Sequence, residues 1–147
     1  MTEETWAKLV PELYVDDIEK TLEFYVDVLG FEMKYGRPEE GFAYLDKEGS
    51  QIMLEQPDDK GRSWKTGVLE KPYGRGINFQ IEIADVDSLY QKLLDLKYPM
   101  FMEIEEKWYR TGDTMGGNRQ FLIQDPDGYL LRFFTHLGEK PVDEDTE

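Results

Sequence analysis

The first half of the chain has period-two hydrophobicity on both sides of one stretch with helical spacing. Residues 8–15 alternate loosely and predict a strand, which Pro11 weakens because proline has no N–H for a sheet. Asp16, with Glu19 three residues on, resembles a capping pair and predicts that a helix begins here. Apolar residues at helical spacing follow: Ile18, Leu22, Tyr25 and Leu29. Strands are expected next at 31–36, 41–47 and 50–55.

The second half has the same order of elements. Residues 77–83 predict a strand, and Asp85 is expected to cap a second helix. The apolar positions of that helix are Val86, Leu89, Tyr90 and Leu93. Strands are expected near 101–109, 118–124 and 129–135. Residues 125–128, Asp-Pro-Asp-Gly, predict a tight turn, because proline presets the second turn position and glycine suits the fourth.

The two halves also share sequence. Residues 46–54 read DKEGSQIML and residues 125–133 read DPDGYLLRF, so residue 46 corresponds to residue 125, an offset of 79. Upstream, LYVDDI begins at residue 13 and IEIADV at residue 81, an offset of 68. A repeat of this length is too long for a solenoid and indicates two equivalent modules.

We therefore expect one domain over residues 1–137. Its modules are placed at 8–56 and 76–136, joined by a linker at 57–75 that is rich in Pro, Gly, Lys and Asp. The polar and acidic end of the chain, 138–147, is expected to be a disordered tail.

Composition excludes several classes of function. The chain has 147 residues, 39% of them hydrophobic, which is enough for a substantial core. A net charge of −15 disfavours nucleic-acid binding and is compatible with a cationic ligand, although acidity also serves solubility. Without cysteine there are no disulfides and no thiolate ligands, and without a signal peptide or membrane-length apolar run we expect a cytoplasmic protein.

Alternation along each strand separates two sets of side chains. The apolar set is expected to pack under the helices: Ile52, Leu54, Ile81, Ile83, Leu131 and Phe133. The opposite set is unusually polar: Val10, Glu12, Tyr14, Gln51, Met53, Glu55, Asn78, Gln80, Glu82, Leu130, Arg132 and Phe134. This polar face is either a solvated sheet surface or the lining of a ligand-sized cleft, and both interpretations stay open.

Three segments together resemble a known family. They are PELYVDDIEKTLEFYVDVLGFE, RGINFQIEIADVDSLYQKL and GGNRQFLIQDPDGYLLRFF. Over residues 8–136 the chain resembles the vicinal oxygen chelate superfamily, which includes glyoxalases, ring-cleaving dioxygenases and bleomycin-resistance proteins. The resemblance implies an α+β fold in which two tandem βαβββ modules form a cupped mixed sheet with helices on its outer face.

The metalloenzymes of this family hold their metal from the first and last strands of each module. The resemblance maps those positions onto Val10, Met53, Asn78 and Arg132. Valine offers no donor, and arginine brings a permanent positive charge to the place of a cation. We therefore expect no metal and no cofactor. The single histidine, His136, is interpreted as a strand-end residue, since catalytic zinc sites need three protein ligands.

This pattern is most similar to the bleomycin-resistance branch, in which a homodimer sequesters a cationic, partly aromatic drug in grooves between subunits without bond chemistry. Trp64, Trp108 and Tyr109 could stack on such a ligand, although ordinary packing or a dimer contact explains them equally well. The full set of expected ligand-binding residues is Glu12, Tyr14, Met53, Glu55, Trp64, Asn78, Gln80, Trp108, Tyr109 and Arg132.

Two other functions remain open. One is a metal-dependent lyase or dioxygenase with an atypical site, using Glu12, Glu55, Glu82 or His136. The other is a degenerate family member that serves only as an interaction or regulatory module.

Overall fold

The computed structural model describes residues 5–58 and 64–142, which divide into two compact units. The first unit comprises Met1–Arg75 together with Asp125–Tyr129, and the second comprises Gly76–Gln124 and Leu130–Glu147. Residues 59–63 of the expected linker and 143–147 of the expected tail lie outside the described residues. The turn at 125–129 therefore belongs to the first unit, although both strands that flank it belong to the second.

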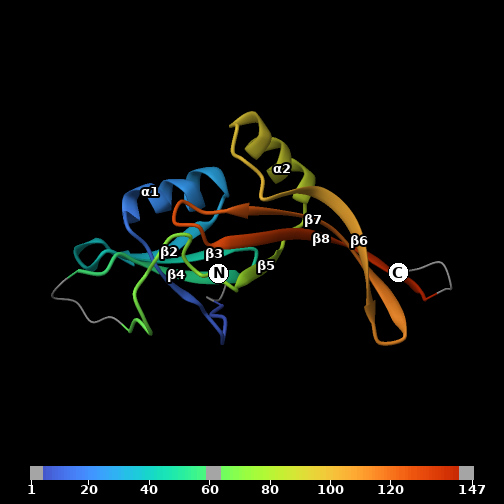
Figure 1. The fold of residues 1–147 in the computed structure, drawn as a ribbon, viewed down its shortest axis with the longest axis horizontal. Coiled ribbons are helices and arrows are strands. Elements are labelled where there is room, and N and C mark those ends of the chain that lie inside the picture. The colour runs from blue at the N-terminus through green and yellow to red at the C-terminus, as the bar shows by residue number, and fades with distance from the viewer. Residues whose placement is uncertain (1–4, 59–63, 143–147) are drawn as a thin grey trace. The chain divides into compact units, whose positions relative to one another are not determined.

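Each unit carries one four-stranded mixed sheet and one main helix (Figure 1). The first unit contains β1 (Glu12–Tyr14), α1 (Ile18–Leu22), the π-helix η1 (Glu23–Val28), β2 (Glu32–Arg37), the 3-10 turn η2 (Pro38–Glu40), β3 (Phe42–Lys47) and β4 (Ser50–Glu55). The second unit contains β5 (Asn78–Glu82), α2 (Val86–Asp95), β6 (Met102–Thr111), β7 (Thr114–Gln124) and β8 (Leu130–Pro141).

The two sheets have equivalent topology. Their strand orders are β1-β4-β3-β2 and β5-β8-β7-β6, and in each the first and last strands of the module pair in parallel while the other neighbours are antiparallel. This confirms the α+β class and the two βαβββ modules expected from the repeat.

The core of each unit lies on the apolar set of strand positions. In the first unit Leu13, Leu45 and Leu54 are at most 4% exposed, as are the helical residues Phe24 and Tyr25. In the second unit the buried strand residues are Ile81, Phe121, Ile123, Leu131 and Phe133, and those of α2 are Val86, Leu89 and Leu93. The ring of Tyr90 on α2 contacts the ring of Phe121 at a centroid distance of 5.2 Å. The polar positions of the same strands are thereby left on the opposite face of each sheet.

Several boundaries differ from the sequence prediction. β1 begins at Glu12, since the residues up to Pro11 do not join the ladder as a strand. The first helix is capped by Asp17, not Asp16: its carboxylate accepts from the Lys20 N–H at 3.2 Å. The cap at Asp85 is confirmed, since its carboxylate accepts from Ser88.

The strands of the second unit are longer than predicted. β7 begins at Thr114, four residues early, because Met-Gly-Gly gives little strand signal. It pairs with β6 across a short turn at Gly112, and with residues 138–141, which complete β8. Residues 138–141 are therefore strand, and the prediction that they belong to a disordered tail is wrong.

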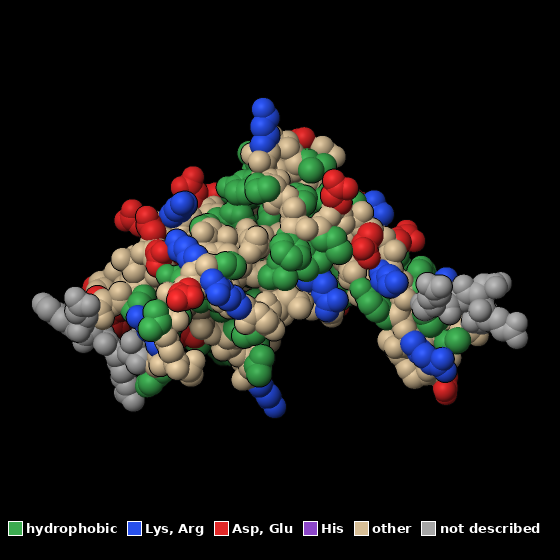
Figure 2. Space-filling view, in the orientation of Figure 1, with side chains coloured by type: hydrophobic (Ala, Val, Ile, Leu, Met, Phe, Trp, Pro, Cys, Tyr) green, Lys and Arg blue, Asp and Glu red, His purple; other side chains and the backbone are tan. Residues whose placement is uncertain are grey.

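Among the described residues, the helices are too short or too polar to cross a membrane. On the face shown in Figure 2, acidic and basic side chains are interspersed and do not gather into a patch of one sign.

Candidate ligand-binding site

The polar face of the second unit's sheet is hollowed by a cavity of about 380 Å³. All four strands contribute residues to its lining, which in chain order are Gln80, Glu82, Tyr109, Thr111, Gly116, Asn118, Phe134 and His136. Strand register explains the set, because Glu82 lies beside Phe134, Asn118 beside His136, and Tyr109 beside Gly116. A volume of this size is within the range of small-molecule sites.

The same sheet face also carries a buried hydrogen-bond acceptor, on Gln120, that no described residue pairs with. Gln120 is 3% exposed and lies beside Phe134 in the sheet, and its side-chain N–H donates to the Tyr109 hydroxyl at 2.6 Å. Its carbonyl oxygen, Oε1, has no hydrogen-bond partner among the described residues. A buried acceptor left unpaired is costly to the folded state.

Glu82 brings a negative charge to the cavity, and Arg132 brings a positive charge beside the lining residue Gln80. The Arg132 Nη2 donates to the Gln80 side-chain oxygen, while its Nε is buried without a partner in the part of the chain that the structure describes. Glu82 is the one carboxylate that lines the cavity. Its charge and the Tyr109 and Phe134 rings suit a cationic or aromatic group.

Two of the residues expected to bind a ligand, Gln80 and Tyr109, line this cavity. Asn78 and Arg132 share the sheet face with Gln80 but are not part of the lining. Trp108 is next to Tyr109 on β6 and so points to the opposite face. Its ring covers Gly117, and the Lys140 ammonium lies 4.3 Å from the ring centroid.

The other expected residues belong to the first unit. Glu12 lies beside Met53, and Tyr14 lies beside Glu55, on one face of that sheet. Trp64 is 67% exposed, and its backbone N–H donates to the Tyr14 hydroxyl at 2.7 Å. Burial and the neighbouring Glu12 raise the pKa of Glu55 above its ordinary value. Whether these residues join one cleft with Arg132 stays a prediction.

The expected ligand-binding set contained two of the eight lining residues. Glu82 and Phe134 were placed on the polar face but not in that set, although they lie two residues beyond Gln80 and Arg132. His136 lies two residues beyond Phe134, on the same face. Gly116 was missed because the start of β7 was missed, and Asn118 because no face was assigned to that strand.

The residues at the family's metal positions do not suit a hard divalent cation. Met53 offers a thioether, Val10 nothing, and the Arg132 guanidinium is engaged with Gln80. Within the described ranges, no three His, Asp or Glu side chains gather closely enough to hold a metal ion.

Comparison with known proteins agrees with this architecture. Residues 8–133 match the model of the Glyoxalase/Bleomycin resistance protein/Dioxygenase superfamily, so the chain belongs to this superfamily. It is 30% identical over 138 residues to a protein named bleomycin resistance protein in Geobacillus stearothermophilus, covering 87% of this chain and 96% of that one.

Two solved structures show the same fold. TioX from Micromonospora sp. ML1 has a TM-score of 0.67 at 22% identity, covering 90% of this chain and all of that chain (100%). Lactoylglutathione lyase from Agrobacterium tumefaciens has a TM-score of 0.57 at 21% identity, covering 90% of this chain and 96% of that chain.

Proposed function

We propose that this protein binds and sequesters a cationic or aromatic drug-like molecule, without a metal and without bond chemistry. The observation that carries the proposal is the cavity of the second unit, which combines the Glu82 carboxylate with the Tyr109 and Phe134 rings. The relatives named bleomycin resistance protein support a role in drug resistance.

Binding of bleomycin tests the proposal directly. In calorimetric titrations with metal-free bleomycin, we expect saturable binding by the wild type and about two- to fivefold weaker binding by Glu82→Gln. Glu82 is exposed in the free protein, and an exposed charge pair is worth up to about 1 kcal/mol, or about fivefold in affinity. Glu103→Gln is the matched control, because Glu103 is an exposed β6 carboxylate outside the cavity. Equal affinities for the two variants, or no binding by the wild type, would contradict the proposal.

We further propose that the protein is a cytoplasmic homodimer and that the ligand groove lies between subunits. Each sheet has two edge strands, β1 and β2 in the first unit and β5 and β6 in the second, and exposed edges are usually paired or covered. Sedimentation should give a dimer at micromolar concentration. A monomer at that concentration rejects the shared groove but leaves the cavity of the second unit as a binding site.

The alternative is a metal-dependent lyase or dioxygenase with an atypical site. One observation favours it: the raised pKa of Glu55, beside Glu12, is a property that a general acid or base needs. A glyoxalase assay with added nickel or zinc separates the two functions, using the wild type and Arg132→Glu, which restores the family's residue type. We expect no activity in either, because Val10, Met53 and Asn78 remain poor ligands; activity would favour the enzyme.

A further inference from the structure

The polar face of the first unit's sheet is covered in part by the start of the chain. Trp6 packs edge-on against Tyr35 and Tyr44, at centroid distances of 6.1 and 5.2 Å. The two tyrosines come from the paired strands β2 and β3 and stack on each other at 5.2 Å. Trp6 and Tyr35 are 48% and 41% exposed, so this aromatic cluster is open to solvent on one side.

A single buried amide, Gln51 on β4, holds the backbone on both sides of Trp6. Its Oε1 accepts from the Ala7 N–H at 2.7 Å, and its Nε2 donates to the Thr5 carbonyl, also at 2.7 Å. A strand neighbour would contact a carbonyl and an N–H flanking one residue in the same way. Gln51 thus hydrogen-bonds to the peptide groups on both sides of Trp6, while Tyr35 and Tyr44 contact the Trp6 ring between them.

Gln51 is itself fixed by the sheet. The Tyr44 hydroxyl donates to its Oε1 at 2.6 Å, and its Nε2 donates to the Asp46 carboxylate at 2.7 Å. These two bonds orient the amide, so that one lone pair and one N–H remain directed at the chain's start. Gln51 is 5% exposed, and releasing residues 5–7 would leave half of a buried amide unpaired.

The second module lacks this arrangement. By the offset of 79, the residue equivalent to Gln51 is Leu130, which has no side-chain polar atom. The amide and its aromatic neighbours are therefore particular to the first unit.

We propose that this face is a second binding site, for an aromatic ring flanked by peptide-type amides, and that residues 5–7 are its intramolecular occupant. The proposal is independent of the cavity in the second unit. A tethered segment competes at an effective concentration in the millimolar range. A ligand of the same chemistry must exceed that competition, so residues 5–7 act as a strap that sets the threshold for occupancy.

N-acetyl-L-tryptophanamide is the probe, because its acetyl carbonyl and carboxamide N–H reproduce the two groups that Gln51 contacts. Binding is followed by NMR through the probe's own signals in every variant, and through the Gln51 side-chain amide signals where Gln51 is present. We expect Trp6→Ala to bind the probe saturably and the wild type to bind it at least threefold more weakly. Trp6→Ala combined with Gln51→Met should not bind. N-acetyl-L-alaninamide should bind to none of them. Leu9→Ala is the matched control and should behave as the wild type, since Leu9 is in the same segment and 84% exposed.

Equal probe affinity in wild type and Trp6→Ala, or binding that leaves the Gln51 signals unmoved, would overturn the proposal. Hydrogen exchange gives a second test. The Ala7 amide of the wild type should be protected, a result that does not depend on the folding of a variant. Gln51→Met should remove that protection. Exchange of Ala7 at the unprotected rate would refute the strap, and protection that rises with protein concentration would assign the face to another copy's segment.

Discussion

The Tyr25 hydroxyl donates a 2.8 Å hydrogen bond to the Asp125 carboxylate, joining a helix to a turn 100 residues away in the chain. Tyr25 lies on η1 and is fully buried, and Asp125 is 5% exposed. The other carboxylate oxygen of Asp125 accepts from the N–H groups of Asp127, Gly128 and Tyr129, each at 2.9 Å. One buried carboxylate thus shapes the turn and fixes it to the helix of the first unit.

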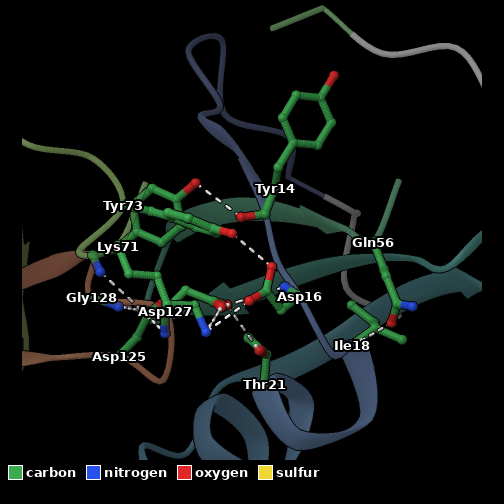
Figure 3. A network of polar contacts seen from close by, with 11 residues as sticks. Tyr14, Asp16, Ile18, Thr21, Gln56, Lys71, Tyr73, Asp125, Asp127 and Gly128 are labelled. Carbon is green, nitrogen blue, oxygen red and sulfur yellow. Dashed lines mark hydrogen bonds and ion pairs between the residues drawn. The ribbon is translucent and has the colours of Figure 1, made fainter. Parts of the chain in front are cut away.

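Neighbouring groups extend this attachment (Figure 3). The Lys71 ammonium lies 2.7 Å from the Asp16 carboxylate and 3.5 Å from that of Asp127. The Tyr73 hydroxyl donates to Asp16 at 2.7 Å, and these contacts lower the pKa of Asp16. The Tyr129 hydroxyl donates to the Tyr14 carbonyl at 2.9 Å, which ties the same turn to β1.

Tyr25→Phe should destabilise the protein by about 1–3 kcal/mol, the range for a buried donor removed from a charged acceptor. The apolar ring stays in place, so packing is conserved and the lost hydroxyl is the cause. Chemical denaturation at pH 7 measures the change. Tyr90→Phe is the control, because Tyr90 packs through its ring against Phe121, and it should cost less than about 0.5 kcal/mol. Equal losses in both variants would refute a special role for the bond to Asp125.

The free energy of unfolding should change with pH because Asp125 titrates differently in the folded and unfolded states. Burial raises the pKa of Asp125 from 3.8 to about 6, although hydrogen bonds from the Tyr25 hydroxyl and from the backbone N–H groups of Tyr129 and Asp127 oppose the shift. The native state therefore holds this proton more tightly than the unfolded state. The contribution of this proton to the free energy of unfolding is complete below about pH 4 and is lost as the pH rises through about 6. At about 1.4 kcal/mol per pKa unit, the difference is about 3 kcal/mol.

Asp125→Asn isolates this contribution. Asparagine can accept the same three backbone N–H groups but does not titrate, so the variant should lack that part of the decline between pH 4 and 7. The measurement is the wild-type free energy of unfolding minus that of the variant, at each pH. A difference that does not change with pH would show that Asp125 titrates normally.

Much of this fold could be predicted from the sequence, since periodicity and the internal repeat depend on local spacing. Asp85 and the turn at 125–128 follow from rules that act over four residues. The partner of Asp125 could not be predicted in this way. A turn motif determines its own backbone hydrogen bonds, but what packs against it depends on residues 100 positions away.

The adjacent acids Asp16 and Asp17 show the same limit at one helix. Either can cap a helix by its local chemistry, and sequence reasoning selected Asp16 because of Glu19. In the structure Asp17 caps the helix, and Asp16 is engaged by Lys71 and Tyr73. Tertiary partners decided between two equivalent local choices.

Arg132→Met should change stability by no more than about 1 kcal/mol if Gln80 is the main partner of Arg132. Gln80 is neutral, so the guanidinium gains little there to offset its partial burial, and methionine keeps the packing of the aliphatic stem. Denaturant unfolding provides the value. A loss of about 3–5 kcal/mol would mean instead that Arg132 is buried and that a carboxylate is its main partner.

Gly117→Ala should destabilise the second unit by about 1–3 kcal/mol, because a Cβ there would lie 2.7 Å from ring atoms of Trp108. The neighbouring Gly116→Ala is the matched control. Its Cβ would lie 3.5 Å from Thr111, an ordinary contact, so the free energy of unfolding should change little. Adding Trp108→Leu to each alanine variant tests the cause. Leucine at position 108 should recover part of the stability lost in Gly117→Ala and should recover none in Gly116→Ala. A double-mutant cycle should therefore give a coupling of at least about 0.5 kcal/mol between positions 108 and 117. Additive effects at positions 108 and 117 would mean that the glycine serves the backbone and not the ring.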